Sequence, residues 1–260
     1  MALLGPDTIL GWQQASERYI DSSMAEKSEF FSAAESTVSA GGKRQSPSRA
    51  AAQAEAHSRR DLLEIAIVFA AIMVAIWTPP GKLNSIFSIV ASACVVAFAV
   101  AGRWGAGELG LRSPLAGLGA TLLTGAILSG LIALIGLALR FAGPGWGVPL
   151  TRSWQYGIWA LEQEFILQSI FFVRLEPRLG SGRAVFAAAT LFAVAHIPSP
   201  VLTILAFSGG VVFCELFRRW RNLYPLGIIH GALGLTIATS LPDHWLHHMR
   251  VGIGYLILHS

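Results

Sequence analysis

Charged residues are scarce in this chain of 260 residues: only 13% are charged, whereas 53% are hydrophobic. A typical soluble domain has about 25% charged residues, so the composition argues against a soluble globular protein and indicates an integral membrane protein. The 19 Lys and Arg residues lie in short clusters between apolar runs and form no basic face. A nucleic-acid partner is therefore not predicted. The positive charges instead indicate how the chain is oriented across the membrane.

Cysteine is also scarce, since the chain has only two, Cys94 and Cys214, and each lies inside an apolar run. This spacing predicts neither a disulfide framework nor a thiolate metal site, and we expect both residues to act as small apolar packing groups. The glycine pair Gly209-Gly210 is not followed by the Lys and Ser/Thr of a phosphate-binding loop.

Long apolar runs are what the chain has in abundance. A membrane-spanning helix needs about 20 apolar residues, and the shorter runs must tilt or be buried within the bundle. We therefore expect an all-α, polytopic transmembrane bundle of about 7–8 helices over residues 59–260, after a poorly ordered tail at 1–58. The runs cover residues 62–77, 86–102, 116–141, 154–173, 185–196, 201–217 and 223–241.

The distribution of basic residues predicts the orientation. The loops after the second, fourth and sixth runs, together with the basic tail, are richer in arginine than the opposite side, so the positive-inside rule places the N-terminus in the cytoplasm. The loop residues counted are Arg103, Arg112, Arg174, Arg178, Arg183, Arg218, Arg219 and Arg221.

Several ionisable residues interrupt the later apolar runs, among them Glu162, Glu164, His196 and His230. Such groups cost about 2.5 to 3.5 kcal/mol each in a membrane span, so a simple anchor has no reason to keep them. In a helix, Glu164 and Gln168 share one face, whereas Glu162 lies roughly 200 degrees round from Glu164. Only one of the two glutamates is expected to face a given pocket.

Glu164, His196 and His230 lie on three successive apolar runs, and such residues can converge in the core of a helical bundle. The trio suits a water-activating base with polarising partners. It equally suits a zinc ion bound by two His and one Glu. Structural interpretations stay open as well, because a buried carboxyl can hydrogen-bond a neighbouring helix and a lone His is often only a satisfied polar group.

Three motifs resemble those of the CAAX protease and bacteriocin-processing (CPBP, or Abi) family of intramembrane endopeptidases. That family carries Glu-Glu-x-x-x-Arg, Phe-x-x-x-His and His-x-x-x-Asn. This chain has Gln163-Glu164-x-x-x-Gln168, Phe192-x-x-x-His196 and His230-x-x-x-Gly234, and the likeness extends over about residues 105–241. The second motif matches in full, and the other two match in part.

The resemblance implies roles for the matched residues. In the family, the first glutamate and the histidine of the second motif activate water, while the last His and Asn stabilise the oxyanion. Gln163 cannot act as a base, so Glu164 is expected to do so beside Gln168, with Glu162 as second choice. His196 would orient the water, and His230 would donate to the oxyanion, with a backbone N–H in place of the amide missing at Gly234.

The predicted function is intramembrane cleavage of a membrane-anchored protein or peptide tail by a glutamic protease without a cofactor, with zinc as the mechanistic rival. The resemblance implies prenyl-type tails, bacteriocin leaders or hydrophobic C-terminal sorting tails as substrates, and a bacterial inner membrane as the location. The alternative is a catalytically inactive relative that binds such a tail, as an immunity protein would. A proton-coupled transporter has less support, because the two halves show no inverted repeat.

Overall fold

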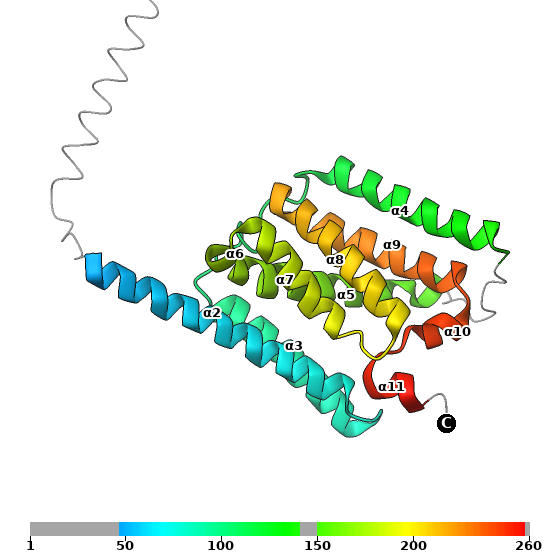
Figure 1. The fold of residues 1–260 in the computed structure, drawn as a ribbon, viewed down its shortest axis with the longest axis horizontal. Helices are drawn as coiled ribbons and strands as arrows, with labels where there is room; N and C mark the ends of the chain where they lie inside the picture. Colours follow the sequence, from blue (N-terminus) through cyan, green and yellow to red (C-terminus); the bar gives the residue numbers. More distant parts are fainter. Residues whose placement is uncertain (1–46, 141–149, 258–260) are drawn as a thin grey trace, which may run out of the picture. The chain divides into compact units, whose positions relative to one another are not determined.

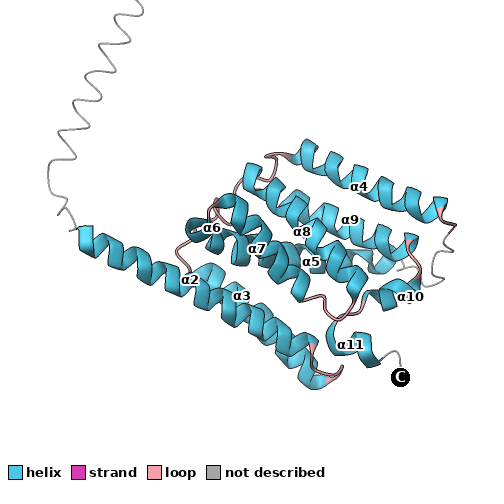
Figure 2. Ribbon diagram, in the orientation of Figure 1, coloured by secondary structure: helices cyan, strands magenta, loops and turns pink. Residues whose placement is uncertain are grey.

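The computed structural model describes residues 47–140 and 150–257, and all regular structure in these ranges is helical (Figures 1 and 2). The predicted all-α class is confirmed. The chain separates into two units between Gln53 and Ala54, and the second of these is compact. The elements are α2 (Pro47–Ile76), α3 (Lys82–Ala101), α4 (Leu118–Ala138), α5 (Leu150–Phe165), η1 (Ile166–Phe172), α6 (Val173–Leu179), α7 (Ser181–Val194), α8 (Pro200–Trp220), α9 (Tyr224–Ser240), α10 (Asp243–Leu246), η2 (His247–Met249) and α11 (Gly252–Ile257).

The predicted tail at 1–58 falls mostly on residues 1–46, which lie outside the described residues, whereas residues 47–58 form the first turns of α2. The seven apolar runs all correspond to helices. Three of these, α3, α4 and α8, have 20 or 21 residues and mean hydropathies of 2.2, 2.1 and 1.9, which suits them to cross a bilayer. The chain is thus a helical membrane protein, and the number and direction of its crossings stay predictions.

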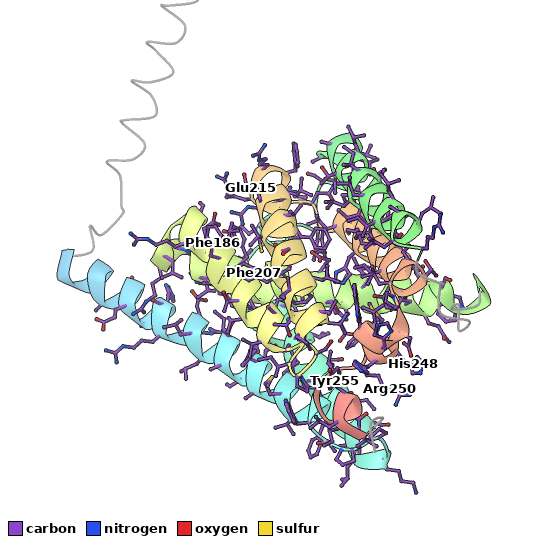
Figure 3. All side chains as sticks on the ribbon, turned by 45° about the vertical axis from the view of Figure 1, so that its right-hand side comes forward. Phe186, Phe207, Glu215, His248, Arg250 and Tyr255 are labelled. Carbon is purple, nitrogen blue, oxygen red and sulfur yellow. The ribbon has the colours of Figure 1, made fainter. Side chains whose placement is uncertain are left out.

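Apolar side chains on the outer faces of the helices fit a lipid surrounding. Figure 3 labels Phe186 on α7 and Phe207 on α8, whose exposed fractions are 57% and 37%. Val100 and Leu137, on α3 and α4, are 82% and 76% exposed. In water these surfaces would be unfavourable, whereas in a bilayer they contact hydrocarbon.

The central helix of the second unit is built from α5, η1 and α6 in succession. All seven residues of the π-helical segment η1 are buried. Phe172 on this segment packs edge-on against Phe217 of α8, with ring centroids 6.1 Å apart. π-Helical turns are rare and are often found at functional sites, and this one begins two residues after Glu164.

Helix α9 packs against both α4 and α5, and Figure 1 shows α4 running beside α9. A glycine stripe on α9, formed by Gly227, Gly231 and Gly234, lies against α5. A Cβ atom at Gly227 would lie 2.6 Å from Leu161 Cδ1, and one at Gly231 would lie 3.6 Å from the Cα of Gly157. Because small residues let helix backbones approach closely in membranes, this stripe sets the short distance between α5 and α9.

Arg174 occupies the protein interior. Its side chain is fully buried and donates from Nε to Glu64 Oε2 of α2 at 2.8 Å, and from Nη2 to the Phe98 carbonyl at 3.0 Å. Arg174 is therefore not one of the loop arginines that set topology, and the prediction is wrong for this residue. Residue spacing alone could not reveal the buried carboxylate on another helix that balances its charge.

Candidate active site

Glu164 lies at the centre of a hydrogen-bonded group formed by two neighbouring helices. Its carboxylate is fully buried. Carboxylate oxygen Oε1 accepts a hydrogen bond from His230 Nδ1 at 2.8 Å. The other oxygen, Oε2, accepts from Gln168 Nε2 at 3.0 Å. The contact expected from the four-residue spacing of Glu164 and Gln168 is present, and each carboxylate oxygen has a donor.

Local geometry explains why these side chains meet. The contacts of the glycine stripe pair Gly227 with Leu161 and Gly234 with Tyr156, so α5 and α9 run antiparallel. Side chains on a helix lean toward its N-terminus, which directs His230 along α9 toward the level of Glu164. The close approach set by the glycines then brings the imidazole to the carboxylate.

Aromatic rings hold the His230 imidazole on two sides. The centroid of Phe213, on α8, is 5.6 Å from that of His230, and the centroid of Phe192, on α7, is 6.0 Å away. The His230 side chain keeps 14% of its surface exposed, while Glu164 has none. The ring therefore connects the buried carboxylate with the space outside the core.

His196 belongs to the same aromatic cluster but does not bond to the Glu164–His230 pair. Its ring lies 4.9 Å from that of Phe192, and its Nδ1 is 2.8 Å from the Phe192 carbonyl oxygen. A carbonyl only accepts, so Nδ1 carries the hydrogen and Nε2 of the neutral ring is an acceptor. The structure thus brings Glu164 and His230 together directly, while Phe192 lies against both histidine rings.

Glu162 faces a different part of the molecule. Its Oε1 accepts a hydrogen bond from Ser92 Oγ of α3 at 2.5 Å, and it lines an open apolar groove with Trp159 and residues of α3. This placement agrees with the angular separation expected from the helix. Glu162 is therefore not part of the Glu164–His230 site.

The candidate metal ligands are not arranged as a metal site. Within residues 47–140 and 150–257, no three His, Cys, Asp or Glu side chains are grouped closely enough to hold an ion. Catalytic zinc sites in proteins have three protein ligands around one open position. As placed, Glu164, His196 and His230 do not fit the zinc alternative.

Residues 145–236 match the family model described as Type II CAAX prenyl endopeptidase Rce1-like. This segment is Rce1-like. It contains Glu164, His196 and His230, and the CAAX protease family predicted from the motifs is confirmed. At the level of the family, the activity is that of a CAAX-type intramembrane endopeptidase, which acts on a membrane-anchored substrate. No curated protein matches the chain.

Within the Rce1-like segment, Tyr156 lies against Gly234, and none of the three motifs includes it. A Cβ at Gly234 would overlap the hydroxyl oxygen of Tyr156 and lie 2.7 Å from two of its ring carbons. A signal was available, because Tyr156, Ala160 and Glu164 are spaced by four residues and so share a face of α5. The contact between the Tyr156 hydroxyl and a glycine of α9 depends on how the two helices pack, so the sequence could not predict it.

Proposed function

We propose that this protein hydrolyses a peptide bond in a membrane-anchored protein or peptide tail, using water activated by the Glu164–His230 pair. The observation that carries the proposal is a fully buried carboxylate that accepts hydrogen bonds from His230 and Gln168. Ionisable groups inside membrane proteins are expensive and usually functional. A buried carboxylate oriented against a partly exposed imidazole is a common arrangement of a general base.

The burial of Glu164 supports a division of roles within the pair. Both of its oxygens already accept hydrogen bonds and its side chain is closed off, whereas the His230 ring is partly exposed. The water proton therefore enters at His230 Nε2, and Glu164 stabilises the imidazolium that results. This differs from the expected roles, in which Glu164 takes the proton itself and His230 donates to the oxyanion.

His196 supplies a second acceptor near the pair. With Nδ1–H donating to the Phe192 carbonyl, Nε2 is free to accept a hydrogen bond from the attacking water. Phe192 contacts both histidine rings and fixes their separation. We propose that His196 orients the water, while the proton itself goes to the Glu164–His230 pair, so no metal or other cofactor takes part.

The proposed substrates are proteins or peptides whose tail is held by the bilayer: a prenyl-type C-terminus, a bacteriocin leader or a hydrophobic sorting tail, of which we favour the last. The apolar outer faces of α3, α4 and α8 support a location in the membrane. We further propose the bacterial inner membrane, with the N-terminus in the cytoplasm.

The test is cleavage of quenched fluorescent peptides that carry each type of tail, by the purified protein in lipid nanodiscs. Glu164→Gln and His230→Ala are expected to lower kcat on the order of 10²- to 10⁴-fold, which is the usual contribution of a general base. Glu162→Gln is the matched control, because it makes the same change two residues away on another face. It is expected to leave kcat unchanged.

Two results would contradict the proposal. Cleavage that survives Glu164→Gln would remove the glutamate from the mechanism. Binding of a tail without cleavage by the unaltered protein would favour an inactive binding or immunity protein.

A further inference from the structure

The Tyr156 hydroxyl is a half-buried donor at the interface of α5 and α9 that has no hydrogen-bond partner among the described residues. Buried tyrosine hydroxyls usually find a partner. Its ring packs directly on Gly234, where the missing side chain leaves the space that the hydroxyl fills. The space at Gly234 thus accommodates this oxygen, yet no described residue accepts a hydrogen bond from the O–H group.

The hydroxyl also lies on the catalytic side of both helices. Gly234 follows His230 by one turn and shares its face of α9, while Tyr156 precedes Glu164 by two turns on one face of α5. Because α5 and α9 are antiparallel, the tyrosine contacts α9 one turn beyond His230, at the helix interface that also holds the Glu164–His230 pair.

Three other side chains of the site each donate to an acceptor within the protein. The amide N–H₂ of Gln168 donates to Glu164 Oε2. Nδ1–H of His230 donates to Glu164 Oε1, and Nδ1–H of His196 donates to the Phe192 carbonyl. Hydrolysis of a peptide bond places negative charge on the carbonyl oxygen, and a preorganised donor aimed at that charge is a large part of catalysis. Among the described side chains, the Tyr156 hydroxyl is a donor for which no acceptor is found.

We propose that Tyr156 is a catalytic residue whose O–H donates a hydrogen bond to the oxyanion of the tetrahedral intermediate. This inference rests on the proposed function. Water oxygen bonds to the carbonyl carbon, its proton passes to His230, and the carbonyl π electrons move to the oxygen that Tyr156 stabilises. When the C–N bond breaks, the proton on His230 passes to the leaving amine, and Tyr156 keeps its own proton throughout.

The first test is Tyr156→Phe, which removes the hydroxyl and keeps the ring on Gly234. We expect kcat to fall on the order of 10²- to 10³-fold, the usual effect of losing one oxyanion donor, with little change in KM or in melting temperature. Tyr224→Phe is the matched control, since the Tyr224 hydroxyl donates to the Leu111 carbonyl at 3.2 Å, away from the site. It is expected to leave kcat unchanged.

The second test replaces the Tyr156 hydroxyl by an asparagine amide at position 234. Gly234→Asn alone should clash with Tyr156 and lower both stability and kcat, because its Cβ would overlap the hydroxyl. In the Tyr156→Ala protein the same change has room, and we expect it to restore part of the lost kcat by placing an amide donor in the vacated space. A tyrosine that served only packing would show no such reversal.

Parallel assays of Glu164→Gln separate the two proposals. Loss of cleavage in Glu164→Gln with full kcat in Tyr156→Phe would overturn the role of Tyr156 and keep the proposed function. Absence of cleavage by the unaltered protein with every peptide offered would overturn both.

Discussion

The glycine stripe on α9 allows a sharp test of how helix packing sets the catalytic geometry. Gly227→Ala and Gly231→Ala add the same methyl group to the same face of the same helix. A Cβ at Gly227 would lie 2.6 Å from Leu161 Cδ1 and 3.2 Å from Leu161 Cα, whereas a Cβ at Gly231 finds no atom nearer than 3.6 Å. At Gly227 the Leu161 side chain must rotate and the backbone at Leu161 Cα must give by a few tenths of an ångström, whereas the contact at Gly231 is ordinary van der Waals contact.

The two substitutions should therefore change the free energy of unfolding in different directions. Replacing a helical glycine by alanine gains about 0.5–1 kcal/mol, so Gly231→Ala should be neutral or slightly stabilising. Overpacking costs about 1–3 kcal/mol, which outweighs this gain, so Gly227→Ala should be destabilised by up to about 2 kcal/mol. Glu164 lies one turn beyond Leu161, and a shift of about 1 Å at a catalytic contact can lower the rate about 10²-fold.

The assay combines thermal unfolding in nanodiscs with cleavage of the tailed peptides. We expect a lower melting temperature and a much lower kcat for Gly227→Ala, and values near those of the unaltered protein for Gly231→Ala. Equal damage from both changes, or none from either, would refute the view that close packing at Gly227 positions the Glu164–His230 pair.

Three further predictions concern the surroundings of the site. Arg174→Met removes the buried partner of Glu64 Oε2 and leaves only Arg60 at Oε1. It should therefore destabilise the fold by less than the about 3–5 kcal/mol of a buried pair broken outright, measured by unfolding in mixed micelles, with partial recovery when Glu64→Gln is added. Gln168→Leu removes one donor to the Glu164 carboxylate, worth about 1.5–3 kcal/mol, and should lower kcat at least about tenfold while Glu162→Gln does not. A zinc chelator should leave cleavage unchanged, because among the described residues no three His, Cys, Asp or Glu side chains are grouped closely enough to hold an ion; inhibition that added zinc reverses would count against this.

The helices and the membrane setting could be predicted from the sequence because both depend on local properties. Apolar runs of sufficient length form helices that a bilayer stabilises, whatever their partners. The shared face of Glu164 and Gln168 and the separate direction of Glu162 follow from helix geometry alone. The Phe192–His196 spacing was likewise sufficient to place both residues in one aromatic cluster, since they lie one turn apart.

The partners of buried polar groups could not be predicted in this way. The sequence position of Arg174 predicts a loop residue that orients the chain in the membrane. In the structure it is buried and bonds to Glu64 of α2, which lies 110 positions earlier. Such a pair is a contact between elements, and nothing in the spacing of either residue identifies the other.

The sequence by itself determined which residues are unusual for a membrane: Glu164, His196 and His230, each costly enough in lipid to mark a site. Only the tertiary structure decided that Glu164 bonds to His230 and not to His196, and that the Tyr156 hydroxyl fills the space at Gly234. The reason is physical. Composition and periodicity fix the face on which a side chain lies, but the depth and distance at which two faces meet depend on how closely their glycines let the helices pack.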